Sequence, residues 1–270
     1  MIRPILKWAG GKSRPLNSLK EHFPKKFSRY IEPFLGGGAV FFGMPEVKAI
    51  INDANPELIS LYEVVRDEPE KLMKELEKLR KIYSEKMFYK LRATLPKGKV
   101  QQAARTIFLN KTGFNGLYRL NSKGEFNVPF GKRPKCPALY DPKNIVAVSK
   151  RLRSAVLLNS DFEEIIDKAK RGDFIYCDPP YQPLSKTASF TSYTPTGFSL
   201  AEQKRLKAAC ERAVKRGAFV AISNSSARSM LALYRGWPVK KIPVKRVINS
   251  KGGSRGALSE ILVSMKRFNA

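Results

Sequence analysis

The chain has 270 residues, 43% hydrophobic and 10% aromatic, which suits a globular protein with one large α/β domain or a core plus a smaller module. It carries 51 lysines and arginines against 23 acidic residues, a net charge of +28, which favours a polyanionic partner, most commonly nucleic acid. General solubility or attraction to a membrane surface would be the alternatives, but no single basic amphipathic helix dominates.

Cysteine and histidine are scarce in the sequence. The three cysteines lie far apart and His22 is the one histidine, so an ordinary zinc site and a Ser-His-Asp triad are poorly supplied. We therefore expect no metal. Nothing resembles a signal peptide or a membrane span, so we expect a cytoplasmic protein.

The first motif is LKWAGGKS, residues 6–13, which ends like a phosphate-binding P-loop. That pattern requires a glycine where this chain has Leu6, and a buried strand for which residues 1–5 leave little room. The motif therefore does not indicate a nucleotide hydrolase. It keeps Trp8, two glycines that permit a tight turn, and Lys12 at the end of that turn.

Residues 28–42, SRYIEPFLGGGAVFF, are typical of a strand, a glycine turn and the start of a helix, and the next strand ends at Asp53. Such glycines allow a cofactor to approach the backbone, and an acid after the second strand accepts hydrogen bonds from ribose. The dinucleotide fingerprint is incomplete, because Phe41 replaces its third glycine and Asp53 comes early. A plain glycine turn would give the same pattern, but an adenosine-type cofactor without a pyrophosphate, such as S-adenosylmethionine, fits it.

From residue 56 to about 95, apolar residues recur at three- and four-residue spacing, which predicts amphipathic helices interrupted at Pro69. Residues 96–142 are instead rich in glycine, asparagine, proline and aromatics. Within them, residues 97–135 hold nine lysines and arginines against one acid, Glu125, which is typical of an insertion. Strands alternating with helices then resume, and they predict a mostly parallel sheet covered on both faces.

The strongest chemical signal is CDPPY, which follows the apolar run FIY. Asp178 would therefore end a strand, where open α/β sheets bind ligands. Pro179 and Pro180 fix the backbone and remove two N–H donors, so this rim presents acceptors, and Tyr181 adds a flat aromatic face. An exocyclic amino group on a planar base suits such a rim. Cys177 is interpreted as a strand residue rather than a nucleophile.

These motifs resemble those of the Dam-type DNA adenine-N6 methyltransferases, of amino-methyltransferase class α, over nearly the whole chain. KWAGGK, EPFLGGGAVF and NDANPELI resemble the family's cofactor motifs, CDPPY its catalytic motif, and GFNGLYRLNSKGEFNVPFG the segment that precedes it. The resemblance implies an α/β, Rossmann-like methyltransferase sheet with an inserted, mainly helical DNA-recognition domain. The S-adenosylmethionine-binding catalytic domain would comprise residues 1–55 and 145–270, and the insertion residues 56–144.

The resemblance also implies roles for single residues. Trp8 would pack near the methionine end of the cofactor, Lys12 near its carboxylate or the catalytic rim, and Asp53 on the ribose hydroxyls. The implied cofactor-binding residues are Trp8, Lys12, Glu32, Pro33, Phe34, Gly36, Gly38, Asp53 and Asp178. The implied catalytic residues are Asp178, Pro179, Pro180 and Tyr181. The implied DNA-binding residues are Asn115, Leu117, Arg119, Asn121, Lys132 and Arg133, whereas Lys123 and Lys135 would contact only phosphates.

The implied reaction moves a methyl group from S-adenosylmethionine to N6 of an adenine flipped out of duplex DNA, leaving S-adenosylhomocysteine. Asp178 and the carbonyl of Pro179 would accept the two N6 hydrogens while Tyr181 stacks on the base. The recognition segment most resembles that of enzymes for GATC. Methylation of cytosine N4 or of RNA adenine, and a non-catalytic DNA-binding protein on this fold, are the alternatives.

The expected partner is double-stranded DNA, without a membrane and without an obligatory protein partner, so the protein would associate with the nucleoid. A second basic run, residues 235–255, has seven lysines and arginines and no acid. It would be another contact with the DNA backbone or a loop.

Overall fold

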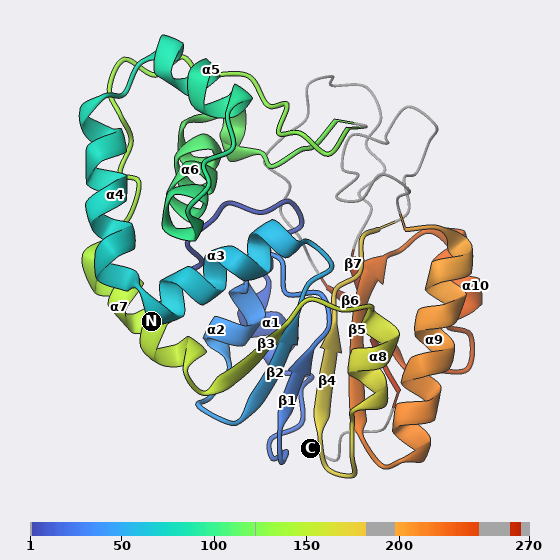
Figure 1. The fold of residues 1–270 in the computed structure, drawn as a ribbon. Coiled ribbons are helices and arrows are strands. Elements are labelled where there is room, and N and C mark those ends of the chain that lie inside the picture. Colours follow the sequence, from blue (N-terminus) through green and yellow to red (C-terminus); the bar gives the residue numbers. More distant parts are fainter. Residues whose placement is uncertain (1, 122, 182–197, 243–259, 266–270) are drawn as a thin grey trace.

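The computed structural model describes residues 2–121, 123–181, 198–242 and 260–265 (Figure 1). They form a seven-stranded sheet in the order β3-β2-β1-β4-β5-β7-β6. β1 to β5 are parallel, whereas β7 runs antiparallel to both β5 and β6. The strands are β1 (Tyr30–Glu32), β2 (Ala49–Asn52), β3 (Ala155–Leu158), β4 (Phe174–Cys177), β5 (Phe219–Ser225), β6 (Val239–Ile242) and β7 (Glu260–Ser264).

Helices cover both faces of the sheet, and a further group stands beside it (Figure 1). One face carries α1 (Leu16–Lys20), α2 (Ala39–Gly43), α3 (Pro56–Asp67) and α7 (Pro142–Leu152); the other carries α8 (Phe162–Asp167), α9 (Leu200–Lys215) and α10 (Arg228–Leu233). Beyond α3 lie α4 (Pro69–Lys81), α5 (Glu85–Ala93), α6 (Lys99–Thr112) and a 3-10 turn, η1 (Phe114–Gly116).

The two faces have separate hydrophobic cores, because successive residues of a strand point to opposite sides of the sheet. In β1, Tyr30 packs with α2 and α3, whereas Ile31 packs with α8 and α9; in β4, Tyr176 and Cys177 divide in the same way. β1, β2 and β4 are buried throughout, which explains why apolar and polar residues do not alternate along them. Cys177 is a fully buried strand residue, as predicted.

The strand order reverses direction between β1 and β4. From β1 the chain proceeds outward through β2 to β3, whereas β4 leads to β5 on the other side. The loops that follow β1 and β4 therefore diverge, which leaves a crevice at the carboxyl ends of these two strands. Ligands of open α/β sheets bind at such a switch point.

The sequence predicted the mixed α/β class with its mostly parallel sheet, and the structure confirms it. The helical stretch predicted after Pro69 consists of two helices, α4 and α5, because Ser84 caps α5 by accepting a hydrogen bond from the backbone N–H of Met87. Although the insertion was expected to be mainly helical, the sequence pattern did not identify α6. It packs against α3, α4 and α5, and residues 103–110 are all buried, so it lacks an amphipathic period.

The proposed division of the chain at residue 144 falls inside α7 and stays a prediction. Among the described helices, none is long and apolar enough to cross a membrane.

Candidate active site at the carboxyl end of the sheet

A cavity of about 590 Å³ opens at the switch point, a size suited to a small-molecule ligand. Its walls are the N-terminal turn, the loops after β1, β2 and β3, and the rim after β4. The expected site residues that line it are Trp8, Lys12, Glu32, Pro33, Phe34, Gly36, Asp53, Asp178, Pro179, Pro180 and Tyr181. Gly38 lies beyond the lining as the N-cap of α2, in the left-handed conformation that favours glycine.

Lys12 lies at the centre of the site with only 3% of its surface exposed. Its Nζ is 2.8 Å from Oδ2 of Asp178, donates a 2.8 Å hydrogen bond to the carbonyl of Gly10, and is 5.0 Å from the ring centroid of Tyr181. It also lies 3.6 Å from Oε2 of Glu260 on β7. The N-terminal turn therefore delivers a buried cation to the rim after β4, the second of the two locations expected for Lys12.

The buried carboxyl groups of the site have raised pKa values. Burial raises the pKa of Asp178, and the charge of Lys12 and its hydrogen bond oppose that rise. Burial likewise raises the pKa of Glu260, again opposed by Lys12. Glu32, at the end of β1, has its pKa raised well above the usual value by burial, although it accepts a 2.8 Å hydrogen bond from the hydroxyl of Tyr30. Lys12 is thus the first of the groups that lower the pKa of Asp178 and favour its ionised form, ahead of Tyr181.

The rim itself is held from behind. Gln203 on α9 is fully buried and donates a 3.1 Å hydrogen bond to the carbonyl of Pro180. Asn224 on β5 in turn donates to Oε1 of Gln203 at 3.0 Å. Gln203 thus holds the carbonyl of Pro180, and Asn224 holds Gln203 in place. The sequence motif gave no sign of either amide.

Trp8 closes over the glycine turn. A Cβ atom added at Gly36 would lie 2.8 Å from Cδ1 of Trp8, and one added at Gly37 would lie 3.1 Å from its Cβ. Gly36 also has a φ of 50°, which side chains rarely adopt. These glycines are therefore required by the approach of the tryptophan as well as by any ligand.

Asp53 follows β2 directly, as expected. Its carboxylate accepts 2.8 Å and 2.9 Å hydrogen bonds from the backbone N–H groups of Gly36 and Asn55. Burial raises its pKa, and these two hydrogen bonds lower it. Asp53 thus fixes the glycine turn and presents its carboxylate to the cavity.

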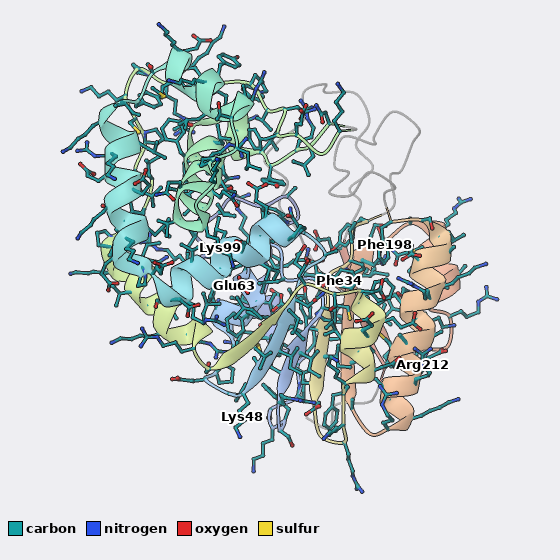
Figure 2. All side chains as sticks on the ribbon, viewed as in Figure 1. Phe34, Lys48, Glu63, Lys99, Phe198 and Arg212 are labelled. Carbon is teal, nitrogen blue, oxygen red and sulfur yellow. The ribbon has the colours of Figure 1, made fainter. Side chains whose placement is uncertain are left out.

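Sequence reasoning identified Phe34 but missed other residues of the site. Phe34, Phe162 and Phe198 form an aromatic wall with ring centroids 5.4 to 5.7 Å apart, and Figure 2 shows Phe34 and Phe198 together above the sheet. Asp161 lies beside this wall as the N-cap of α8. Asp53 was predicted because it follows a strand, and the same reasoning could have identified Asp161, which follows the parallel strand β3. Glu260 had no such signal, since it begins an antiparallel strand far along the chain.

A family model described as D12 class N6 adenine-specific DNA methyltransferase matches residues 8–249. The chain belongs to this family of methyltransferases.

The methyltransferase is similar to several curated relatives over nearly its full length. It is 41% identical to the Type II methyltransferase M1.LlaDCHI of Lactococcus lactis subsp. cremoris, over 97% of this chain and 95% of the relative. It is also 41% identical to the Type II methyltransferase M.MjaIII of Methanocaldococcus jannaschii, over 97% and 98%. The DNA adenine methylase of Escherichia coli K12 is 33% identical, over 98% and 95%. The resemblance seen in the motifs is confirmed, and the protein is an adenine-specific DNA methyltransferase.

The expected recognition segment, residues 113–121 and 123–135, forms an irregular hairpin joined by bridges between Gly113 and Phe130 and between Leu120 and Phe126. Asn115 and Leu117 are exposed on it, as are Lys132 and Arg133. Among the described residues other than glycine, Asn115 and Lys132 alone have positive φ angles, 54° and 49°. Such backbone strain concentrates at functional sites, so these two positions are consistent with a role in binding.

Two expected base-reading residues are engaged within the hairpin. Arg119 donates a 2.7 Å hydrogen bond from Nε to Oδ1 of Asn127. Asn121 accepts from the backbone N–H groups of Lys123 and Glu125 and donates to the carboxylate of Glu125, which closes the turn. The geometry gives Asn121 a structural task, and its contact with DNA stays a prediction.

The second basic run and the expected absence of a metal concern the rest of the molecule. Most of the second basic run, residues 243–255, lies outside the described residues. Among the residues that are described, no group of three or more histidine, cysteine or acidic residues could hold a metal ion.

Proposed function

We propose that this methyltransferase moves the methyl group of S-adenosylmethionine to N6 of an adenine flipped out of duplex DNA, within the sequence GATC. The observation that carries the proposal is the ion pair between the buried Lys12 and the partly exposed Asp178, 2.8 Å apart at the rim after β4. It joins a cofactor turn to an acceptor for an exocyclic amino group. The family supplies the class of reaction, DNA adenine-N6 methylation.

The residues around the cavity fit S-adenosylmethionine. Asp53 presents a carboxylate for ribose hydroxyls, and the aromatic wall of Phe34, Phe162 and Phe198 offers flat faces for an adenine. Trp8 and the glycine turn would border the methionine part, with Lys12 close by. The cofactor would supply an electrophilic methyl group, and S-adenosylhomocysteine would remain.

The rim would position the amino group of the target adenine. Asp178 and the carbonyl of Pro179 would each accept one N–H, which leaves the nitrogen lone pair directed at the methyl group. Tyr181 would stack on the base and recover part of the few kcal/mol that unpairing and unstacking cost. Positioning and electrostatics are then the main contributions, as in other reactions with a preorganised site.

The insertion of residues 56–144 would hold the duplex. Asn115, Leu117 and Arg119 would meet the bases, and Lys132 and Arg133 the adjacent DNA. Support for GATC comes from the resemblance of residues 116–132 to the recognition segment of enzymes for that site. An enzyme bound in this way would be found with the nucleoid.

Transfer of labelled methyl from S-adenosylmethionine to duplexes with GATC or a scrambled site tests the proposal. Label in N6-methyladenosine from the GATC duplex alone is the expected result. Label in the scrambled duplex would overturn the target sequence but keep the reaction. Label on no nucleic acid would overturn the proposed use of S-adenosylmethionine.

A further inference from the structure

Tyr118 connects the recognition segment to the cofactor cavity. It stands between Leu117, which is 38% exposed, and Arg119, yet it is itself only 5% exposed. A side chain so buried is not available to the bases. It points inward, from the segment that would meet DNA toward two walls of the cavity.

The first connection is to Trp8. The ring of Tyr118 stacks on the Trp8 ring with centroids 4.8 Å apart and an interplanar angle of 29°. Trp8 lines the cavity and covers Gly36 and Gly37. A change in the position of Tyr118 is therefore transmitted to the wall beside the glycine turn, because close-packed rings do not deform continuously.

The second connection runs through the hydroxyl group of Tyr118. It donates a 2.7 Å hydrogen bond to Oε2 of Glu57 and accepts a 3.3 Å hydrogen bond from Nδ2 of Asn55. The backbone N–H of Asn55 donates to Oδ1 of Asp53 at 2.9 Å. One residue thus separates the hydroxyl from the carboxylate assigned to the ribose.

A third contact clamps the same two parts of the chain. Asn110 of α6 is fully buried, and its amide oxygen accepts a 2.9 Å hydrogen bond from the backbone N–H of Lys7. Its amide nitrogen donates to the carbonyls of Lys7 at 2.9 Å and Gly116 at 3.0 Å. The N-terminal turn and the start of the recognition segment are therefore held as one unit, next to Tyr118.

From these contacts we propose that Tyr118 is a positioning residue that couples cofactor binding to duplex binding; the inference rests on the proposed function. A duplex that orders the recognition segment also orders Trp8 and Asp53 through Tyr118. Binding of the cofactor then costs less conformational entropy, so the cofactor binds more tightly. By reciprocity the cofactor tightens duplex binding by the same factor.

The experiment measures the dissociation constant of S-adenosylhomocysteine by calorimetry, with and without a short GATC duplex, so that no methyl transfer intervenes. In the parent enzyme we expect the duplex to tighten binding by about fivefold or more, within the usual range of allosteric coupling. Tyr118→Phe keeps the ring stacked on Trp8 but removes the hydroxyl group. We expect the factor by which the duplex tightens binding to fall by at least about threefold, since the hydrogen bonds to Glu57 and Asn55 are lost.

Tyr83→Phe is the matched control. Its hydroxyl also lies in the insertion and donates a 2.9 Å hydrogen bond to the carbonyl of Arg133, but Tyr83 does not line the cavity. This variant should keep the parent coupling factor. A second readout uses Trp237→Phe, which leaves Trp8 as the single tryptophan of the chain. Its emission should respond to the duplex, and adding Tyr118→Leu should abolish that response.

The inference is overturned if the duplex tightens binding of S-adenosylhomocysteine to the parent enzyme by less than about twofold. It is also overturned if the duplex tightens binding to Tyr118→Phe by the same factor as in the parent. Neither result would contradict cofactor binding or methyl transfer. An equal loss of coupling in Tyr83→Phe would also overturn it. If S-adenosylhomocysteine binds neither the free enzyme nor the complex and no methyl is transferred, the proposed function fails and the inference fails with it.

Discussion

In the cavity, Lys12 is 3% exposed and is surrounded by Asp178, Glu260 and the carbonyl of Gly10, whereas Lys132 and Arg133 of the recognition segment are exposed to solvent. A buried charge is costly to leave unpaired, so each group in the cavity depends on its neighbours. An exposed cation has little to lose when a neighbour changes, and it is open to a polyanion. The cavity should therefore control the rate of chemistry, and the segment the affinity and choice of DNA.

The largest expected effect is that of Asp178→Ala in the cavity. Loss of a positioned acceptor should slow methyl transfer by at least roughly 10²- to 10³-fold, while duplex affinity stays largely intact. Single-turnover transfer and duplex binding, measured on the same protein, check this. Asp67→Ala, at an exposed carboxylate of α3, is the control. A parallel loss of duplex binding in Asp178→Ala would break the division between the two regions.

Arg119→Ala should have the next largest effect, on target choice. A lost bidentate base contact costs about 1–3 kcal/mol of discrimination against the wrong base, and non-specific affinity should change less. Competition between GATC duplexes and single-base variants measures it. Lys123→Ala, expected to remove only a phosphate contact, should weaken all duplexes alike. A uniform loss for Arg119→Ala as well would contradict base reading by this residue.

Lys12→Met should alter the pH dependence of transfer. Burial raises the pKa of Asp178 and Lys12 opposes the rise, so removing the cation should raise that pKa further. Because the carboxylate form accepts the amino N–H, activity is lost as pH falls through this pKa. The acid limb of the single-turnover rate should therefore move to higher pH in the variant. An unmoved limb would mean that Asp178 is not the titrating group.

The smallest effect should come from Lys132→Ala and Arg133→Ala. Each removes one exposed cation, so each should reduce the slope of log affinity against log salt by about 0.9 if it neutralises one phosphate. Duplex titrations over a range of salt concentrations measure the slope, and the transfer rate at saturating DNA should not change. A fall in that rate would show that the segment contributes to chemistry as well.

The sequence was most informative where a function depends on residues that are neighbours in the chain. Asp53 and Asp178 each follow an apolar strand, so their location at the carboxyl edge of the sheet follows from local pattern alone. Glu260 reaches Lys12 because β7 pairs antiparallel with β5, and α6 is buried because three other helices surround it. No local motif predicts the position of Glu260 or the burial of α6. Both depend on pairing and packing between segments that are far apart in the sequence.

The contact between Trp8 and Gly36 also limits how this chain can evolve. Any side chain at Gly36 would meet Cδ1 of Trp8 at 2.8 Å, so the glycine cannot drift while the indole remains. A smaller residue at position 8 would remove that clash but leave the positive φ of Gly36 in place. We therefore expect substitutions to arise at position 8 first and at position 36 only afterwards. In a lineage that has lost the tryptophan, only the positive φ of the turn would favour glycine at position 36.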